Sequence, residues 1–461
     1  MRIGRLIALA VVVVALGAYI LLVERHQPTT DERKEQADKL FVGLDQAKAK
    51  KITVTNSHGT FELVKDKDTW LLKAPLADQA NQGAASSLLF SMAGLKAERT
   101  FKAGEVKLAD YGLDKPPLKV TVEDEAGKSF ALKLGSELPL GNLRAATTAG
   151  DKVYLVNKYI ASDLEKDLSG WRSDELAQVY AGDVASVTVV SAAGPLVLAH
   201  AGAVWTITAP SPDLADRDRA DGVISDISGA RIKEFVDTAP DLKALGLEPP
   251  KFAVTIVKRD AKAAPIVLDF GNERDAKDGK QVACKRGERV FWVEARAASR
   301  LGAPWQDWRS KQLVSFDSWT IDKLEVEAGA SKAALERKDG VWKAGSVEVD
   351  PDPVSRRLNT LSDLKVSAFD RPKPAGQPLG HVKAMGEGGV SVDVTFFAGT
   401  PDALAIVAGR TGAFAVDASK VKEIVADPAA LAKPKPTPTP TAKPSATAKP
   451  SATAKPTPAT K

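Results

Sequence analysis

A tryptophan-centred phrase occurs three times in this chain at a nearly constant spacing. Residues 70–75 read WLLKAP, residues 205–210 read WTITAP, and residues 342–345 read WKAG. A period of this length can hold a whole domain that buries its own core. The sequence therefore predicts three tandem copies of one domain, called here repeats 1, 2 and 3.

Other landmarks return in the same order. Residues 111–117 (YGLDKPP) match 245–250 (LGLEPP), and the triplet WRS closes the first two copies at 171–173 and 308–310. The third copy is degenerate, with Leu379-Gly380-His381 where the Gly-Leu-x-x-Pro-Pro phrase is expected and no closing Trp-Arg. A catalytic residue required in every copy would recur with these landmarks, and none does.

The pattern within one copy predicts an α+β domain. Alternating residues at 52–55 and 60–64, separated by turn residues, indicate an antiparallel meander that ends at Trp70. Apolar residues at 88, 89, 92 and 95 then share one face of a single main helix, and further strands follow. The predicted segments are a transmembrane anchor (1–23), a polar stalk (24–50), repeat 1 (51–180), repeat 2 (181–317), degenerate repeat 3 (318–428) and a disordered tail (429–461).

The N-terminus has the pattern of a membrane anchor. Arg2 and Arg5 precede an uncharged run over residues 6–23, which would span about 27 Å as a helix. The arginines favour a cytoplasmic N-terminus, which predicts a single-pass bacterial inner-membrane protein with most of its chain in the periplasm. A signal peptide cleaved near residues 15–17 is the alternative, although the apolar run continues to Val23. The absence of any cysteine other than Cys284 excludes a lipoprotein.

The C-terminal segment carries the net positive charge. Residues 433–461 contain six lysines, eight prolines and no acidic residue, so the formal charge of +5 becomes −1 for the rest of the chain. Such a composition favours an extended, unfolded segment that attracts anionic cell-wall polymer, although a plain solubilising tail fits nearly as well. The near-neutral body argues against nucleic-acid binding.

The residues that could carry chemistry are scattered. His26, His58, His200 and His381 are far apart, and no cysteine joins them, so we expect no metal site. Cys284 lies in a strand-like stretch where repeat 1 has Thr147, which favours a structural role. The sequence predicts no catalytic, cofactor-binding or metal-binding residue.

Acidic clusters precede the main helix in two copies. Asp213, Asp216 and Asp218 lie before the second helix, and Asp350 and Asp352 lie before the third. Catalytic carboxylates of a glycosidase and calcium ligands are two interpretations of these clusters, although the calcium-loop pattern is absent. Carboxylates that cap the free N–H groups at a helix start are the stronger interpretation.

The tryptophans also allow two interpretations. Trp70, Trp205 and Trp342 could be sugar-stacking platforms, but a tryptophan that recurs at the end of a hairpin is more often the anchor of a core. The Trp-Arg pairs at 171–172 and 308–309 lie where one copy passes to the next. We expect them to pack the joint between domains, with the arginine bonded to a carbonyl or a carboxylate.

At the Trp-x-Leu-x-x-Pro phrase, the leucine-rich helix and the Gly-Leu-x-x-Pro-Pro loop, the chain resembles a bacterial family of repeated domains of unknown function. The resemblance covers residues 50–310 well and 318–427 weakly. It implies one N-terminal membrane anchor and an accessory role beside an ABC transporter and auxiliary proteins of the gliding-motility type. It brings no catalytic residues.

Together these observations predict a non-enzymatic, membrane-anchored periplasmic accessory or scaffold protein. Its expected partners are the inner membrane through residues 6–23 and an ABC-transporter or motility-type envelope complex. The competing prediction is a module that binds an envelope polymer, either peptidoglycan or polysaccharide.

Overall fold

The computed structural model describes residues 39–434 except 103, 140, 149, 151, 387 and 388. The predicted transmembrane segment 6–23, the first part of the stalk and the tail beyond residue 434 lie outside the described residues. Within the described part, no helix is both long enough and apolar enough to cross a membrane.

Repeat 1 forms one sheet with its helices. Its strands and helices are β1 (Ala49–Asn56), β2 (Gly59–Asp66), β3 (Thr69–Ala74), β4 (Asp78–Gln79), α3 (Gln82–Ala93), β5 (Arg99–Phe101), η2 (Leu108–Tyr111), β6 (Leu118–Asp124), β7 (Ser129–Glu137), β8 (Leu143–Thr147), β9 (Val153–Asn157), α4 (Ile160–Leu164) and α5 (Leu168–Trp171).

Repeat 2 follows the same order after a short 3-10 turn. It contains η3 (Ala181–Asp183), β10 (Val184–Ser191), β11 (Gly194–Ala201), β12 (Val204–Ala209), β13 (Asp213–Leu214), α6 (Arg217–Gly229), β14 (Ile232–Val236), β15 (Phe252–Lys258), β16 (Ile266–Ala276), β17 (Gly279–Arg286), β18 (Arg289–Glu294), η4 (Ala295–Ala298) and η5 (Trp305–Trp308).

Repeat 3 keeps the strands and changes the ending. It contains η6 (Ser318–Thr320), β19 (Ile321–Ala328), β20 (Ser331–Lys338), β21 (Val341–Ala344), β22 (Val347–Glu348), α7 (Pro351–Ser362), β23 (Val366–Arg371), β24 (Pro378–Gly386), β25 (Ser391–Phe397), β26 (Ala403–Val407), β27 (Ala413–Val416), α8 (Ala418–Val425) and α9 (Pro428–Leu431).

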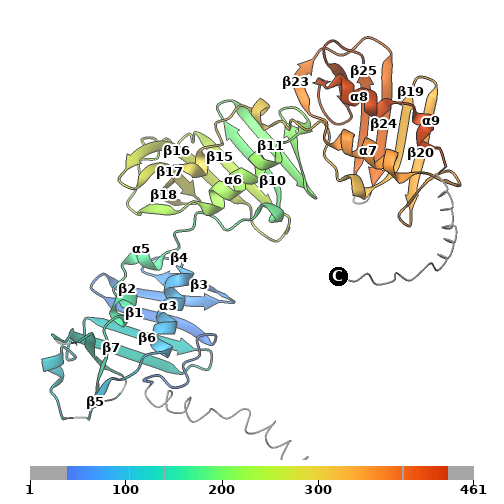
Figure 1. The fold of residues 1–461 in the computed structure, drawn as a ribbon. Helices are drawn as coiled ribbons and strands as arrows, with labels where there is room; N and C mark the ends of the chain where they lie inside the picture. Colours follow the sequence, from blue (N-terminus) through green and yellow to red (C-terminus); the bar gives the residue numbers. More distant parts are fainter. Residues whose placement is uncertain are drawn as a thin grey trace, which may run out of the picture. The chain divides into compact units, whose positions relative to one another are not determined.

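The three sheets share one topology. Each has nine strands, in the orders β4-β3-β2-β1-β6-β7-β8-β9-β5, β13-β12-β11-β10-β15-β16-β17-β18-β14 and β22-β21-β20-β19-β24-β25-β26-β27-β23. The neighbouring strands that exchange hydrogen bonds run antiparallel, as in β1 with β2 and β6. Figure 1 shows α3, α6 and α7 each lying over a sheet. The prediction of three tandem domains built mainly from antiparallel strands is confirmed.

Alternation along the strands decides which face is buried. In β1, Ile52 and Val54 are buried while Thr53 lies on the opposite, partly exposed face. The main helix covers the apolar face, as the side chains of Leu88 and Met92 on α3 are fully buried. This is the helix face that the spacing predicts.

The three recurring tryptophans belong to the cores. Trp70, Trp205 and Trp342 are 4%, 1% and 5% exposed. Trp205 also donates its ring N–H to Asp221 on α6 at 2.8 Å, which ties the third strand of the meander to the main helix. The core interpretation is therefore confirmed, and the sugar-stacking interpretation of these three rings is wrong.

The Gly-Leu-x-x-Pro-Pro loop packs against a glycine of a later strand. Gly112 and Gly246 have φ angles of 66° and 67°, a left-handed conformation that favours glycine. Across from them, a Cβ on Gly135 or Gly271 would collide with the preceding loop's backbone carbonyl. A close backbone approach between loop and strand thus explains the phrase in the first two copies.

Two expectations differ from the structure. Leu379-Gly380-His381 was expected in a loop equivalent to the Gly-Leu phrase, but these residues lie within β24. Repeat 3 has too few landmarks around residue 380 to align its sequence with the loops of repeats 1 and 2. The described end of the predicted stalk, residues 39–50, forms turns and the start of β1, because Phe41 and Leu44 pack into the core of repeat 1.

The chain enters each repeat along the same path. Single antiparallel bridges join Lys39 to Lys96, Glu175 to Arg231 and Gln312 to Lys365. In repeats 1 and 3 the next residue donates its N–H to the carbonyl before the bridge partner, from Leu40 to Leu95 and from Leu313 to Leu364, both at 2.9 Å. The incoming segment is therefore held at the end of the main helix.

By their internal contacts, the residues divide into two compact units. The first unit holds the chain through Leu176 together with Arg231–Val236. The second unit holds Ala177–Ala230 and the chain from Asp237 onward. The second unit thus contains the joint between repeats 2 and 3.

Candidate functional site

The described histidines do not form a site. His58 lies in the β1–β2 turn, His200 on β11 stacks on Trp205 with ring centroids 4.1 Å apart, and His381 on β24 bonds Asp393 at 2.8 Å. Across the part of the chain that the structure describes, no group of three or more His, Cys, Asp or Glu side chains is arranged to hold a metal ion. His26 lies outside that part.

Cys284 is buried on β17. Burial away from water raises the pKa of its thiol far above its ordinary value, so the thiol stays protonated at neutral pH. Its surroundings favour a side chain that packs rather than one that reacts.

The acidic clusters contain two kinds of carboxylate. Asp216 caps α6 by accepting the N–H of Arg219 at 2.9 Å, and Asp350 caps α7 by accepting the N–H of Asp352 at 3.1 Å. Asn81 does the same for α3. Asp213 is different, because it lies on β13 and faces a buried arginine instead of a helix terminus.

The first closing triplet contains a buried ion pair. Arg172 Nε lies 2.8 Å from Asp78 Oδ2, and the two side chains are 3% and 4% exposed. The Arg172 guanidinium also lies 3.7 Å from the ring centroid of Phe235 on β14. The arginine therefore combines a carboxylate partner with an aromatic face.

The second triplet repeats this arrangement. Arg309 Nε pairs with Asp213 Oδ2, and its guanidinium lies 4.3 Å from the ring centroid of Phe369 on β23. Its Nη1 also lies 2.6 Å from Asp370 Oδ2. Asp213 and Arg309 are buried, whereas the Asp370 side chain is 62% exposed. Repeat 2 supplies Asp213 and Arg309, and repeat 3 supplies Phe369 and Asp370.

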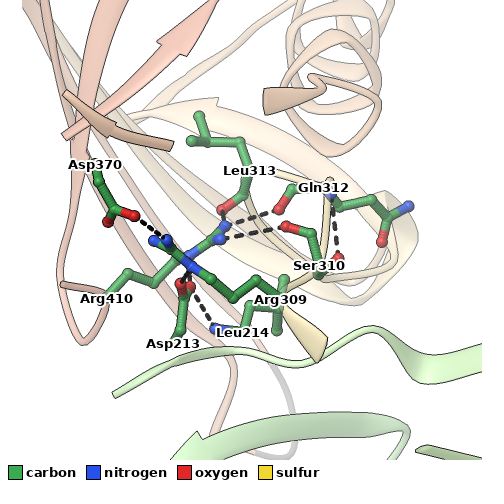
Figure 2. A network of polar contacts seen from close by, with 8 residues as sticks. All are labelled: Asp213, Leu214, Arg309, Ser310, Gln312, Leu313, Asp370 and Arg410. Carbon is green, nitrogen blue, oxygen red and sulfur yellow. Dashed lines mark hydrogen bonds and ion pairs between the residues drawn. The ribbon is translucent and has the colours of Figure 1, made fainter. Parts of the chain in front are cut away.

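A second arginine comes from repeat 3. Arg410, in the loop between β26 and β27, pairs its Nε with Asp213 Oδ1. Its Nη1 donates to the carbonyls of Gln312 and Leu313, each at 2.7 Å, and Nη2 donates to the carbonyl of Ser310 at 3.3 Å. Figure 2 shows the guanidinium groups of Arg309 and Arg410 converging on the Asp213 carboxylate. Arg410 thus holds the segment that connects the two repeats.

Burial sets the electrostatics of this network. Desolvation lowers the pKa of Arg410, and the neighbouring Asp213 carboxylate opposes that shift. An arginine remains cationic at physiological pH even so. Two guanidinium groups and the Asp213 and Asp370 carboxylates give a charge-balanced cluster, which suits a fixed joint better than proton transfer.

The junction where one repeat ends and the next begins is called here the handover. Backbone hydrogen bonds hold it in the same way at the ends of repeats 1 and 2. Asn81 donates its N–H to the Trp171 carbonyl at 2.9 Å, and Asp216 donates to the Trp308 carbonyl at 2.7 Å. Single bridges join Ala80 to Arg172 and Ala215 to Arg309, and the corresponding bridge in repeat 3 joins Val349 to Pro434. The position of the closing arginine is therefore taken by Pro434 at the end of repeat 3.

Repeat 3 also lacks the carboxylate. β22 occupies the place of β4 and β13 in its sheet, and its first residue is Val347, where Asp78 and Asp213 stand in the other two. Val347 is 43% exposed. Repeat 3 is the last repeat in the described part of the chain. Both members of the ion pair are replaced in it.

The sequence prediction for the Trp-Arg pairs is confirmed in part. An arginine bonds a carboxylate, as expected, but Asp78, Phe235 and Phe369 were not identified as its partners. The sequence does contain a signal for the two phenylalanines. Phe101, Phe235 and Phe369 are evenly spaced along the chain, at nearly the same period as the tryptophans. Arg410 carried no such signal.

A cleft of about 940 Å³ lies beside this network in the second unit. Its lining includes Asp216, Arg217, Lys311, Asp363 and Lys365. Its charged lining residues thus include both acids and bases.

A family described as a domain of unknown function (DUF4340) matches residues 70–248 and again residues 205–379. The chain belongs to this family. Each match begins at a recurring tryptophan, Trp70 or Trp205, and extends through the closing triplet into the next repeat. Each match therefore includes one Asp–Arg pair with its phenylalanine. No curated protein matches the chain.

Proposed function

We propose that this protein is a non-enzymatic scaffold, anchored in the bacterial inner membrane by residues 6–23, whose three domains stand in series in the periplasm. It serves as an accessory component of an ABC-transporter or motility-type envelope complex. The family resemblance is the source of the transporter and motility association. The topology follows from Arg2, Arg5 and the uncharged run after them.

The buried network around Asp213 is the observation that carries the scaffold proposal. A chain of domains can keep a fixed spacing only if its joints resist bending. Asp213, Arg309 and Arg410 place three nearly inaccessible charges at a joint, with side chains 1%, 2% and 5% exposed. A buried, hydrogen-bonded ion pair specifies one geometry, because breaking it leaves an uncompensated charge.

An envelope-polymer-binding module is the alternative. Its first basis, aromatic platforms at the recurring tryptophans, is removed by their burial in the cores. Its remaining basis is the lysine-rich tail, which lies outside the described residues. The scaffold therefore accounts for more of the chain.

Topology is tested by fusing alkaline phosphatase after residue 180. We expect an active reporter, because that enzyme matures only outside the cytoplasm. An inactive phosphatase, together with a cytoplasmic reporter that is active at the same position, would contradict the anchor.

Affinity purification of the full chain from solubilised membranes distinguishes the two functions. Recovery of transporter subunits, retained after washing at high salt, supports the scaffold. Recovery of peptidoglycan or polysaccharide without a protein partner would favour the polymer-binding module. A variant that lacks residues 435–461 is the control, because the scaffold predicts that the protein partners remain.

A further inference from the structure

The main helix of repeat 1 differs in chemistry from its two counterparts. α3 reads QGAASSLLFSMA and contains no charged residue, whereas α6 reads RDRADGVISDISG and α7 reads PDPVSRRLNTLS. The three helices occupy the same place in the fold, each over its own sheet (Figure 1). The repeats therefore provide an internal comparison of one surface in three versions.

The difference lies on the outer face of the helix. On α3 this face consists of Gly83, Ser86, Ser87 and Phe90, all exposed, with Phe90 70% exposed. At the equivalent positions of repeat 2, α6 has Asp218, Asp221, Gly222 and Ser225. At those of repeat 3, α7 has Asp352, Ser355, Arg356 and Asn359.

A second exposed aromatic side chain lies at the start of α4, the helix that packs against α3. Tyr159 precedes α4 and is 63% exposed. Asp163 on α4 accepts hydrogen bonds from Ser87 and Ser91 at 2.9 and 2.6 Å, which holds the two helices together. In repeat 2, Arg296 stands at the place of Tyr159 and Arg300 at the place of Asp163, where it pairs its Nε with Asp226 on α6 at 2.6 Å. Phe90 is thus an exposed aromatic ring on an uncharged helix face, and aromatic residues are enriched in protein interfaces.

The position of the incoming chain limits what can reach this surface. Leu40 donates its N–H to Leu95 at 2.9 Å, just beyond the last residue of α3. Residues 24–38 therefore separate Val23 from the C-terminal end of α3, and the chain from Val23 to Leu40 spans at most about 60 Å when fully extended. With residues 6–23 in the bilayer, the α3 surface stays within reach of the membrane face.

The chain's own N-terminal segment does not fit the surface. Residues 24–38 read ERHQPTTDERKEQAD and are too rich in charge to cover an uncharged helix. The bilayer itself is also a poor fit, because helices that lie on membranes carry lysine or arginine on their polar face, and α3 has none. The surface of another protein in the membrane is within reach of α3 and can also be uncharged where it contacts the helix.

We propose that the outer face of α3, with Phe90 as its anchor, docks an integral membrane protein that presents an uncharged, apolar surface at the periplasmic side. This inference rests on the proposed function, since it requires the anchor at residues 6–23. It assigns partner contact to repeat 1, and not to the equivalent helix faces of repeats 2 and 3.

Site-specific photo-crosslinking in intact cells tests the proposal. p-Benzoylphenylalanine is placed at position 90, and at positions 225 and 359 as matched controls on α6 and α7. We expect an adduct with one integral membrane protein from position 90 and none with that protein from the controls. An adduct only with phospholipid, only with a second copy of this chain, or none at all would overturn the docking surface.

Co-purification supplies the second readout. The crosslinked protein should be recovered with the unmodified chain and about tenfold less with Phe90→Ser, which installs the residue of repeat 2. Ser225→Phe serves as the reciprocal control and should change nothing. Equal recovery with Phe90→Ser, when thermal unfolding shows that the variant is folded, would overturn the role of Phe90.

Membrane fractionation separates this proposal from the function on which it rests. A full-length chain recovered in the soluble fraction would contradict the anchored scaffold. A membrane-bound chain with no protein adduct at position 90 would contradict the docking surface alone.

Discussion

The ends of repeats 2 and 3 share one backbone path but differ in their side chains. At the end of repeat 2, Asp213 and Arg309 form a buried pair. At the end of repeat 3, Val347 and Pro434 stand in the same two places, and the single backbone bridge remains between Val349 and Pro434. The single backbone bridge that closes a repeat therefore forms with or without the aspartate–arginine pair.

This difference indicates what the ion pair does. Repeat 3 buries a core that includes Trp342, Phe396 and Phe414 without any such pair. The core of a repeat can therefore form without the ion pair. The pair is present where a further repeat follows, which assigns it to the handover between repeats.

Removing Arg309 should have the largest effect. Arg309→Met leaves the buried Asp213 carboxylate with Arg410 as its remaining cation, and we expect a loss of about 3 kcal/mol in the free energy of unfolding of the second unit, at the low end for breaking a buried ion pair. Urea denaturation followed by tryptophan fluorescence measures it.

The triple variant Asp213→Leu/Arg309→Met/Arg410→Met is the control for this prediction. It removes all three buried charges and should recover part of the loss, because no buried charge is left alone. A single variant that loses less than about 1 kcal/mol would mean that the pair is solvated in solution.

Removing Arg410 should have a smaller effect. Arg410→Ala deletes the donors to the carbonyls of Ser310, Gln312 and Leu313 but leaves the Asp213–Arg309 pair in place. We expect a loss of about 2–3 kcal/mol by the same denaturation measurement. A loss as large as that of Arg309→Met would show that the two arginines act as one group.

The exposed end of repeat 3 should tolerate charge. Val347→Asp introduces the residue that repeats 1 and 2 carry at this place, on a side chain that is 43% exposed. We expect a change within about 0.5 kcal/mol. The reciprocal change Asp213→Val should cost several times more, and equal effects of the two substitutions would break the comparison.

Sequence reasoning identified the elements that repeat but not the contacts that join them. The tryptophan period located three cores, because the same residue serves each core in the same way. Arg410 could not be found, since its partner Asp213 is 197 residues away. The Leu379-Gly380-His381 segment was misplaced because repeat 3 keeps the strand there and loses the loop phrase.

Cys284 provides a reporter for the smallest expected effect. It is the only cysteine in the sequence and lies in the core of repeat 2, where burial raises the pKa of its thiol. We expect slow alkylation under native conditions, and a smaller acceleration in Arg309→Met than in a variant of the core of repeat 2. Trp205→Ala, which opens the core, should accelerate the reaction and serves as the positive control.

Hydrogen–deuterium exchange on Arg309→Met tests most directly whether the ion pair belongs to the handover. The account predicts that exchange accelerates most in the connecting residues 310–314 and in the β26–β27 loop that carries Arg410, while β10, β15 and α6 of repeat 2 remain the most protected segments. Loss of protection throughout the sheet and helix of repeat 2 would contradict the account, because it would place the pair in that repeat's own core.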